Sequence, residues 1–424
     1  MALGSDFRRL WAASAASEAG SAVGFGAIPL VAILVLQVPA WQVSLLATVS
    51  GLAAAAIALP AGPWIEFRRK RPIMIGADLA RAGALLSIPA ALVAGALTYT
   101  HLAAVAVVQA AGAIVFTAAS GAHLKALVDA ADRTAATGRL EATFWIANSA
   151  GPPVGGVLIS WLGVAATVSV DAVSFLLSAL GIRSIGGREP GPPARIAGAG
   201  RRTQIVAGWR YIAAHPGLRA LFLNAQIFGA AMMAGSPLLA VLLLRELHLP
   251  AWQYGLAYGL PCLGGVLGAL ALTPLTRRYG QRLVMLAAGV GRALWVCPLA
   301  AVPAGLGGLL LVIGLSTLAL FGSGLFNPAF AAYRMAVTDD RYLSRVGACW
   351  SITSRVSQPA GIAAGGALAA VADVRTALLI CGIGVLSSAA FLPWQTAHVN
   401  PPPLPDGRLG APPPTPAVAQ RGQQ

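Results

Sequence analysis

The 424-residue chain has little charge: Asp, Glu, Lys and Arg together make up 10% of it, and only 14 residues are acidic. Hydrophobic residues make up 57%, and the mean hydropathy is +0.74. Long stretches without charge are typical of membrane-spanning helices and exceed what a soluble domain of this length needs. The composition therefore predicts an integral membrane protein whose main surroundings are the lipid bilayer.

Lysine and cysteine are scarce as well. Neither Lys70 nor Lys125 lies in the Gly-Lys-Ser/Thr context of a phosphate-binding loop, which excludes an ATPase of that kind. The cysteines lack the spacing of a disulfide or metal framework, and all lie in apolar segments: Cys262, Cys297, Cys349 and Cys381. No nucleophile, base or metal cluster with catalytic spacing is apparent. We expect no enzyme activity, metal or cofactor, so a gradient or a partner must drive any work.

The net charge of +15 is distributed unevenly. Basic residues gather in alternate loops, such as 68–71 and 277–282, whereas loops 37–41 and 99–101 contain none. This is the positive-inside pattern of membrane proteins and not a nucleic-acid surface. With Arg8 and Arg9 before the first apolar run, we expect a multi-pass protein of a bacterial cell membrane with both termini in the cytoplasm.

Twelve apolar runs are long enough, at roughly 20 residues each, to cross the hydrocarbon core. They lie near 10–36, 42–65, 72–97, 102–122, 140–162, 164–183, 218–244, 252–275, 283–303, 307–332, 346–371 and 375–395. These runs predict an all-α fold of two six-helix bundles, residues 1–183 and 217–396. A cytoplasmic linker, 184–216, contains an interfacial helix with Ile205, Trp209 and Ile212 on one face. A Pro-rich tail, 397–424, is expected to be disordered.

The two halves share one plan. Pro39-Ala40-Trp41-Gln42 recurs 211 residues later at 250–253, and at the same offset Arg71, Met74 and Arg81 match Arg282, Met285 and Arg292. At an offset of 210, Gly155-Gly156 match Gly365-Gly366. Duplicated apolar halves predict a transporter that binds its substrate between them.

The loop after the second apolar run, from Gly62 through Glu66 to Arg68, Lys70 and Arg71, resembles the signature loop of the major facilitator superfamily. The resemblance implies that Glu66 caps or pairs with a helix of the other half and holds the inner gate shut. A basic loop that only sets topology is the alternative. Asp78 and Arg81 follow on one helix face and can pair. Because Gly289 replaces Asp78 beside Arg292, we expect these residues to form a network near the inner gate.

The fifth run resembles the motif of the drug-antiporter branch of that superfamily. Its matching residues are Gly138, Gly151, Pro152, Gly155 and Gly156, with Ala147 in place of one glycine. Glycine lets membrane helices approach closely and proline bends them, so this helix can seal or open a cavity. The resemblance implies export, and ordinary helix packing is the alternative. The strings 78–81, 139–141, 171–175 and 327–329 are similar to the macrolide-efflux and enterobactin-exporter branch.

A few ionisable residues fall inside the apolar runs, where each costs at least ~2.5–3.5 kcal/mol to insert. Glu18 lies near the expected midplane, and a carboxyl in an apolar setting can exchange a proton near neutral pH. We expect Glu18 to couple transport to protons; Asp171 is either a second proton site or a structural partner of Ser174. Polar residues expected to line the cavity, or else to bond between helices, are Gln109, Asn148, Asn224, Gln226, Asn327, Arg355 and Gln358.

These patterns together predict a proton-driven exporter, working as a monomer by alternating access. The scarcity of charge in the cavity favours an amphipathic organic substrate, such as an antibiotic or secondary metabolite. A siderophore exporter of the same fold remains an alternative, in which Arg355 meets an anionic ligand. A membrane scaffold or sensor that transports nothing is the other alternative.

Overall fold

The computed structural model describes residues 4–66, 68–129, 132–186, 201–339 and 342–394. Within these ranges the chain is helical and contains no strand. The N-terminal half comprises α1 (Ser5–Val23), α2 (Ala27–Leu30), the π-helical turn η1 (Val31–Val35), α3 (Ala40–Glu66), α4 (Lys70–Val93), α5 (Tyr99–Leu127) and α6 (Arg133–Arg183).

The C-terminal half begins with α7 (Arg201–Ala214). It continues with α8 (Pro216–Val241), the π-helical turn η2 (Leu242–Glu246), α9 (Ala251–Gly259), α10 (Cys262–Tyr279), α11 (Gln281–Leu294) and the 3-10 turn η3 (Cys297–Ala301). The last elements are α12 (Leu306–Val337), α13 (Leu343–Val371), α14 (Val374–Ser387) and the 3-10 turn η4 (Ser388–Phe391).

These elements make twelve membrane-length passes, six in each half. Ten stretches of the described residues are long and apolar enough to span a bilayer. One of them, within α6, contains two passes, because the helix turns sharply at Gly163, whose φ of 81° favours glycine. The 29-residue α13, which carries Arg345 and Arg355, is also long enough to span. The all-α fold of two six-helix bundles is confirmed, including the break expected at residue 163.

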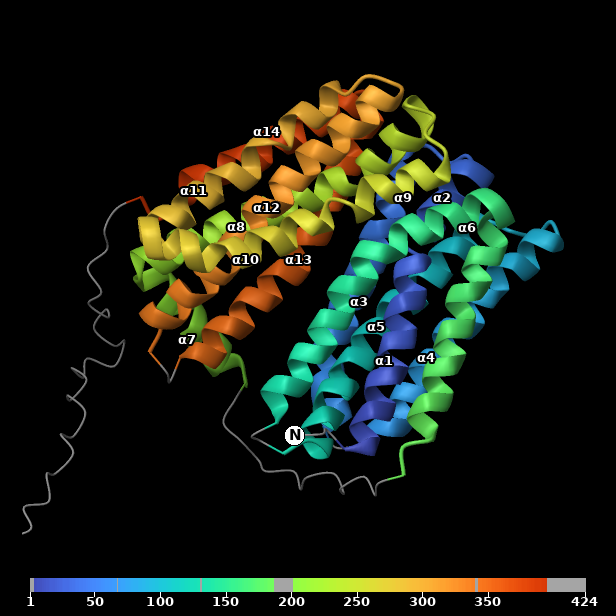
Figure 1. The fold of residues 1–424 in the computed structure, drawn as a ribbon, viewed down its shortest axis with the longest axis horizontal. Helices are drawn as coiled ribbons and strands as arrows, with labels where there is room; N and C mark the ends of the chain where they lie inside the picture. The colour runs from blue at the N-terminus through green and yellow to red at the C-terminus, as the bar shows by residue number, and fades with distance from the viewer. Residues whose placement is uncertain (1–3, 67, 130–131, 187–200, 340–341, 395–424) are drawn as a thin grey trace, which may run out of the picture.

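The two halves meet at one end of the molecule and separate toward the other (Figure 1). We call the end where α2 and α9 meet the closed end. The opposite end carries the basic loop at 68–70, Arg277 and Arg278, and we call it the basic end. The helix α7 lies there beneath the C-terminal half, where its Tyr211 stacks on Tyr342 at 4.7 Å between ring centroids.

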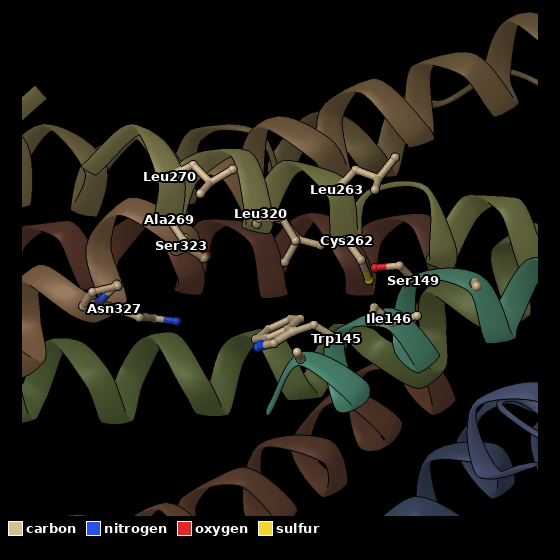
Figure 2. Close-up of a pocket in the computed structure, with 16 residues that line it drawn as sticks. Trp145, Ile146, Ser149, Cys262, Leu263, Ala269, Leu270, Leu320, Ser323 and Asn327 are labelled. Carbon is tan, nitrogen blue, oxygen red and sulfur yellow. The ribbon is translucent and has the colours of Figure 1, made fainter. Parts of the chain in front are cut away.

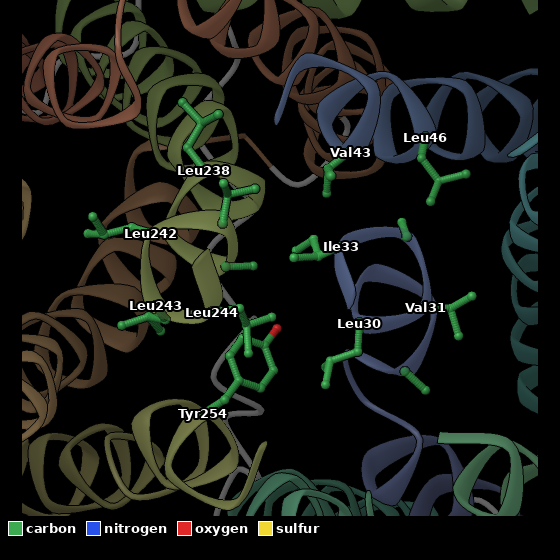
Figure 3. Close-up of a cluster of buried hydrophobic side chains, with 14 of the residues drawn as sticks. Leu30, Val31, Ile33, Val43, Leu46, Leu238, Leu242, Leu243, Leu244 and Tyr254 are labelled. Atoms are coloured by element: carbon green, nitrogen blue, oxygen red, sulfur yellow. The ribbon is translucent and has the colours of Figure 1, made fainter. Parts of the chain in front are cut away.

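Apolar side chains from both halves fill the closed end. Leu30 and Ile33 of the N-terminal half belong to the same buried cluster as Leu238, Leu242 and Tyr254 of the C-terminal half (Figure 3). The other buried clusters each lie within one half. Contact between the halves is therefore concentrated at the closed end.

The turns that form this end are duplicated. Both η1 and η2 are π-helical, and each is followed by a non-glycine residue with positive φ, Gln37 at 51° and His248 at 53°. Such a backbone is strained for residues other than glycine, so its appearance at both copies marks a shared feature of the repeat.

The linker helix was expected at 202–215 and lies at Arg201–Ala214. Ile212 is buried against the C-terminal half, whereas Trp209 is 43% exposed. The side chain of Ile205, the linker residues 187–200 and the tail from 395 lie outside the described residues.

Candidate functional site

A single arginine organises the polar interior of the N-terminal half. The Nε atom of Arg81, on α4, donates to Gln109 Oε1 of α5 at 3.2 Å, and its Nη2 donates to Ser21 Oγ of α1 at 3.4 Å. The guanidinium lies 3.8 Å from the ring centroid of Phe175 on α6, close enough for a cation–π contact. Arg81 therefore joins its own helix, α4, to three others, α1, α5 and α6.

Three carboxylates, Asp78, Asp171 and Glu18, lie close enough to interact electrostatically with this arginine, although none of them forms an ion pair with it within 4 Å among the described residues. Asp78 is fully buried, and neither of its carboxylate oxygens has a hydrogen-bond partner among the described residues. Ser178 and Arg81 are its polar neighbours. Buried acids are costly inside a bilayer, so a cluster of three around one cation is a candidate functional site.

The carboxylate of Asp171 lies directly against the backbone of α1. A Cβ atom added to Gly24 would stand 2.5 Å from Asp171 Oδ2, and one added to Gly20 would collide with Ser174. Just beyond, α1 ends at Val23 and the chain turns through Gly26, with φ of 78°. Asp171 thus touches the point where the first pass bends, and it belongs to the Arg81 cluster as well as to the Ser174 contact expected from sequence.

Glu18 occupies a different position in the cluster. It is half-buried and lines a cavity of about 470 Å³ between α1, α5 and α6, which Glu141 also lines. Within the described part of the chain its charged neighbour is Arg81. Of the three acids, Glu18 is the one that faces a cavity.

The corresponding arginine of the C-terminal half has different neighbours. Arg292 is 4% exposed, and its Nη2 donates to Asn224 Oδ1 at 2.8 Å. Its guanidinium lies between the rings of Phe228 and Phe326, at 3.7 and 3.8 Å from their centroids. Asn224 in turn donates to the carbonyl of Ser388 at 2.7 Å. Amide and aromatic groups hold this cation where carboxylates surround Arg81.

The network expected near the inner gate is placed differently. The described partners of Arg81 all belong to the N-terminal half, and those of Arg292 to the C-terminal half. Arg81 lies in the middle of α4 and Arg292 in the last turn of α11, and the side chain of each contacts described residues of its own half.

The basic loop is only partly described. Arg68 lies over the ring of Trp64 at 4.8 Å, Arg71 donates to the carbonyl of Ile185 at 2.9 Å, and Lys70 is the first residue of α4. The side chains of Gly62 and Glu66 lie outside the described residues, so the gating role of Glu66 stays a prediction.

The glycine motif of α6 lies at the boundary between the halves. Gly151 and Gly155 approach Ala22 and Val23 of α1, with the ideal Cβ of Gly155 only 1.9 Å from the Val23 carbonyl oxygen. Gly156 approaches Ala251, in α9 of the other half. Gly138 has no atom within 4 Å of its Cβ position and is exposed, so it contributes no close packing.

A cavity of about 770 Å³ lies between α6 and the C-terminal half (Figure 2). Trp145, Ile146 and Ser149 of α6 form one wall. The facing wall consists of α10 and α12 and includes Cys262, Ala269, Ser323 and Asn327. Asn327 was expected from sequence, but the other lining residues were not, because uncharged side chains in an apolar helix give no signal of which face they occupy.

The remaining predicted cavity residues differ in their surroundings. Gln109 bonds to Arg81 and Asn224 to Arg292, which makes both interhelical bonds. Asn148 donates to the carbonyl of Phe144 in its own helix. Gln226 bonds to Ser354 and Ser357 of α13.

Arg355 and Gln358 lie on α13, which packs against α3 of the other half. Pro359, about one turn after Arg355, contacts the Cβ position of Gly51 on α3, so Arg355 lies on the side of α13 that faces the N-terminal half. Gln358 faces Gly229 of α8 instead. Arg355 is half-buried, and the described residues provide no hydrogen-bond or ion-pair partner for it. Among the predicted cavity residues, Arg355 is therefore the charged side chain that is available to pair with a ligand.

No group of three or more His, Cys, Asp or Glu residues in the described ranges is arranged to hold a metal ion. The polar features of the molecule are thus the Arg81 cluster, the Arg292 site, Arg355, and the cavity between the halves.

Comparison with known proteins places this architecture. A family described as Transmembrane secretion effector matches residues 4–307, and the Major Facilitator Superfamily matches residues 221–421. The chain is 26% identical over 393 residues to the multidrug efflux pump Tap of Mycolicibacterium fortuitum, covering 90% of this chain and 94% of that one. It is also 26% identical to the enterobactin exporter EntS of Citrobacter koseri, over 60% of each chain.

Among solved structures, a bacterial homologue of the iron transporter ferroportin in its inward-facing state has a TM-score of 0.71 at 15% identity, covering 92% of this chain and all of that one. The same homologue in its outward-facing state has a TM-score of 0.60. These likenesses show the shared fold. With the twelve passes, the repeat and the family matches, they establish that the chain belongs to the major facilitator superfamily, as a transporter of the efflux type.

Proposed function

We propose that this transporter exports an amphipathic organic compound in exchange for protons. The observation that carries the proposal is the contrast between Arg81, surrounded by Asp78, Asp171 and Glu18, and Arg292, which the described residues leave without a carboxylate. Proton exchange needs carboxyls that can be neutral or charged inside the membrane. One half supplies them around a fixed cation.

In this proposal the basic end faces the cytoplasm of a bacterial cell and the closed end faces outward. A proton that reaches Glu18 or Asp171 from outside weakens their attraction to Arg81. The helices that these acids bridge, α1, α4 and α6, then move more freely relative to one another. Release of the proton to the cytoplasm restores the attraction. A membrane potential adds ~2.3 kcal/mol per charge per 100 mV to bias the cycle.

Asp171 can link protonation to the closed end. Its carboxylate touches α1 beside the bend at Gly24 and Gly26, and the residues just beyond that bend, Ala27 to Ile33, pack in the closed end. A change of charge on Asp171 therefore acts on the segment that seals the transport path.

The test is the Glu18→Gln variant in inverted membrane vesicles. It should abolish pH-driven uptake of a fluorescent drug while leaving the protein folded, because the amide keeps the shape but cannot exchange a proton. Glu246→Gln is the matched control: Glu246 is an exposed carboxylate paired with Arg375 at 2.9 Å, and such pairs contribute little. Full coupled transport by Glu18→Gln would remove Glu18 from the mechanism.

Arg355 favours a second candidate function, export of an anionic compound such as a siderophore. It is a half-buried cation on the side of α13 that faces the other half, and a relative of this chain is named an enterobactin exporter. Arg355→Gln should then abolish export of an iron-chelating anion and leave efflux of a neutral dye intact. Equal loss of both would assign Arg355 to general architecture.

A protein that transports nothing would behave differently from both. Dye efflux from cells, abolished by an uncoupler, would reject a scaffold or sensor role. We also propose that the monomer is the transporting unit, which mixing wild-type with inactive chains would test, since activity should then fall only in proportion to the inactive fraction.

A further inference from the structure

The cavity between α6 and the pair α10 and α12 has the character of a binding site that opens sideways. We propose that it binds a neutral, lipid-soluble molecule that arrives from within the bilayer. This inference rests on the proposed export function, since it names the chemistry and the access route of the substrate.

The size and position of the cavity suit a substrate. Its volume of about 770 Å³ falls in the range of small-molecule sites, roughly 300–1,000 Å³. One wall comes from the N-terminal half and the facing wall from the C-terminal half (Figure 2). Rocking of the halves must therefore change its width, as a transport site requires.

Its chemistry excludes a charged ligand. None of the described lining residues is ionisable except the thiol of Cys262, whose Sγ lies 3.5 Å from the carbonyl of Tyr258. The hydroxyl of Ser323 already donates to the carbonyl of Ala319 at 3.0 Å. A bound ion would leave water without a counter-charge, at a cost of several kcal/mol in such surroundings.

Three polar groups of the lining remain for the ligand: the amide of Asn327, the hydroxyl of Ser149 and the indole N–H of Trp145, none of which has a hydrogen-bond partner among the described residues. Asn327 is exposed on α12, and its side-chain amide has no partner among the described residues. Trp145 lies across the cavity on α6, where its ring offers a flat apolar surface (Figure 2). The site thus matches a neutral aromatic or polycyclic molecule with a small number of hydrogen-bonding groups.

The rim of the cavity is apolar and accessible. Ile146 is 68% exposed, Leu263 51% and Leu270 70%, although all three lie in helices that span the membrane. In a bilayer such side chains face acyl chains. A molecule dissolved in the lipid can therefore reach the cavity between α6 and α10 without crossing water.

The helix α6 lines both this cavity and the pocket of Glu18. Trp145, Ile146 and Ser149 line the cavity between the halves, while Glu141 and Phe144 line the pocket of Glu18. Glu141 lies one helical turn before Trp145, so the two sets occupy adjoining parts of the surface of one helix, which continues into the Gly-Pro bend. A ligand bound in the cavity between the halves can therefore affect the pocket of Glu18 by moving α6.

The experiment uses photolabelling of the full chain in lipid vesicles without a proton gradient. The probe is an aryl diazirine carrying an octyl chain, which is neutral and lipid-soluble, and labelled residues are mapped by mass spectrometry. Labelling at Trp145 and Ile146 should saturate and be displaced by unlabelled probe, unlike labelling at the lipid-facing Leu180, which is 61% exposed. The same diazirine bearing a trimethylammonium group should not label the cavity saturably.

Two variants sharpen the result. Ala269→Phe fills the cavity and should weaken saturable labelling by about tenfold, which corresponds to ~1.4 kcal/mol. Ala104→Phe adds the same ring at an exposed position of α5 away from the cavity and should leave labelling unchanged. Non-saturable labelling at Ile146, or equal labelling by the cationic probe, would overturn the proposal.

The outcome is independent of export itself. If the probe binds saturably but is never exported, the site stands and the export function fails. If a compound is exported against its gradient while no saturable labelling occurs, export stands and the lateral site fails.

Discussion

The two halves of this transporter share a backbone plan but differ in the groups around one repeated arginine. Arg81 lies among Asp78, Asp171 and Glu18, whereas Arg292 is held by Asn224 and two phenylalanine rings. Phe228, which stacks on Arg292, stands 210 residues after Glu18, close to the offset of the repeat. The duplicated fold has thus kept the cation in both halves and kept titratable partners in one.

Removing the two arginines should have unequal effects. Arg81→Met removes the hydrogen bonds to Gln109 and Ser21 and leaves three carboxylates without their nearest cation, and polar groups left unsatisfied inside a protein cost about 1–3 kcal/mol each, more when charged. Arg292→Met removes a buried charge that lacks an acid, so the lost desolvation cost offsets the lost contacts to Asn224 and the rings, and we expect a change of about 1 kcal/mol. Thermal unfolding of both variants in the same detergent measures the difference.

Transport provides the second readout of this pair. Arg81→Met should lose pH-driven transport, and Arg292→Met should retain its dependence on the proton gradient. Equal damage from the two substitutions, in stability and in coupling, would mean that the acids around Arg81 have no special role.

The repeated glycine pairs allow a finer test. Gly155 and Gly365 approach helices of their own half, at Val23 and Ala234, and their substitution by Ala forces backbones apart, which costs about 1–3 kcal/mol of bundle stability. Gly156 instead approaches Ala251 of α9 in the other half, and its substitution should loosen the closed end. Gly138→Ala, with open space around it, is the control.

Thermal unfolding reports the bundle variants, and distances between two spin labels, one in each half at the closed end, report Gly156→Ala. Longer distances are expected for Gly156→Ala alone. If Gly155→Ala lengthened these distances equally, the proposal that Gly155 packs its own bundle and Gly156 closes the contact between the halves would be wrong.

Much of the fold could be predicted because its signals are strong and local. Apolar length gave the passes, the break at Gly163 lay between two runs, and the glycine and proline spacing marked the helix at the boundary between the halves. Asp78 and Arg81 were expected to interact because they lie on one helix face, and they do so electrostatically.

The sequence could not show which polar residues face the cavity. Membrane helices are apolar on every face, so their periodicity does not show which way Gln109 or Asn224 points. In the structure each of them bonds to the arginine of its own half, Gln109 to Arg81 and Asn224 to Arg292. The placement of Asp171 beside Arg81 depends on packing between distant helices. The cavity wall at Trp145 and Ser323 had no sequence signal for the same reason.

The duplicated turns at the closed end differ in charged residues, because η2 contains Arg245 and Glu246 whereas η1 contains none. Arg245 of η2 donates from Nη2 to the carbonyl of Ile33 in η1 at 3.3 Å, a bond between the halves. Leu34 stands 211 residues before Arg245, so the N-terminal turn offers no matching donor. Arg245→Leu should remove about 1 kcal/mol from the closed state, which is roughly a fivefold shift in population toward opening of this end.

The same spin-label distances measure that shift. Arg375→Gln is its matched control, because Arg375 bonds to Glu246, Ala300 and Val302, all within the C-terminal half. It should change stability slightly and leave the population unchanged. A shift as large as that of Arg245→Leu would assign the effect to loss of a surface arginine in general.

The smallest expected difference lies at the turn that joins the last two passes of each half. In the N-terminal half this turn is made by Gly163, and 210 residues later Asp373 caps α14. The side chain and backbone N–H of Thr376 donate to Asp373 and lower the pKa of its carboxyl below the usual value. A lowered folded pKa means that the cap stabilises the fold above the usual aspartate range and is lost as the pH falls through the lowered value.

Asp373→Ala should therefore lower the melting temperature slightly at neutral pH, because an N-cap is lost, and have no further effect once the wild-type cap is protonated. Thermal unfolding of both proteins across the acidic range measures how their difference closes. Gly163→Ala should lower the melting temperature at every pH alike, since its cost is strain at positive φ and involves no proton. If the difference for Asp373→Ala stayed constant with pH, the cap would act through shape alone, and the two turns would differ in geometry and not in charge.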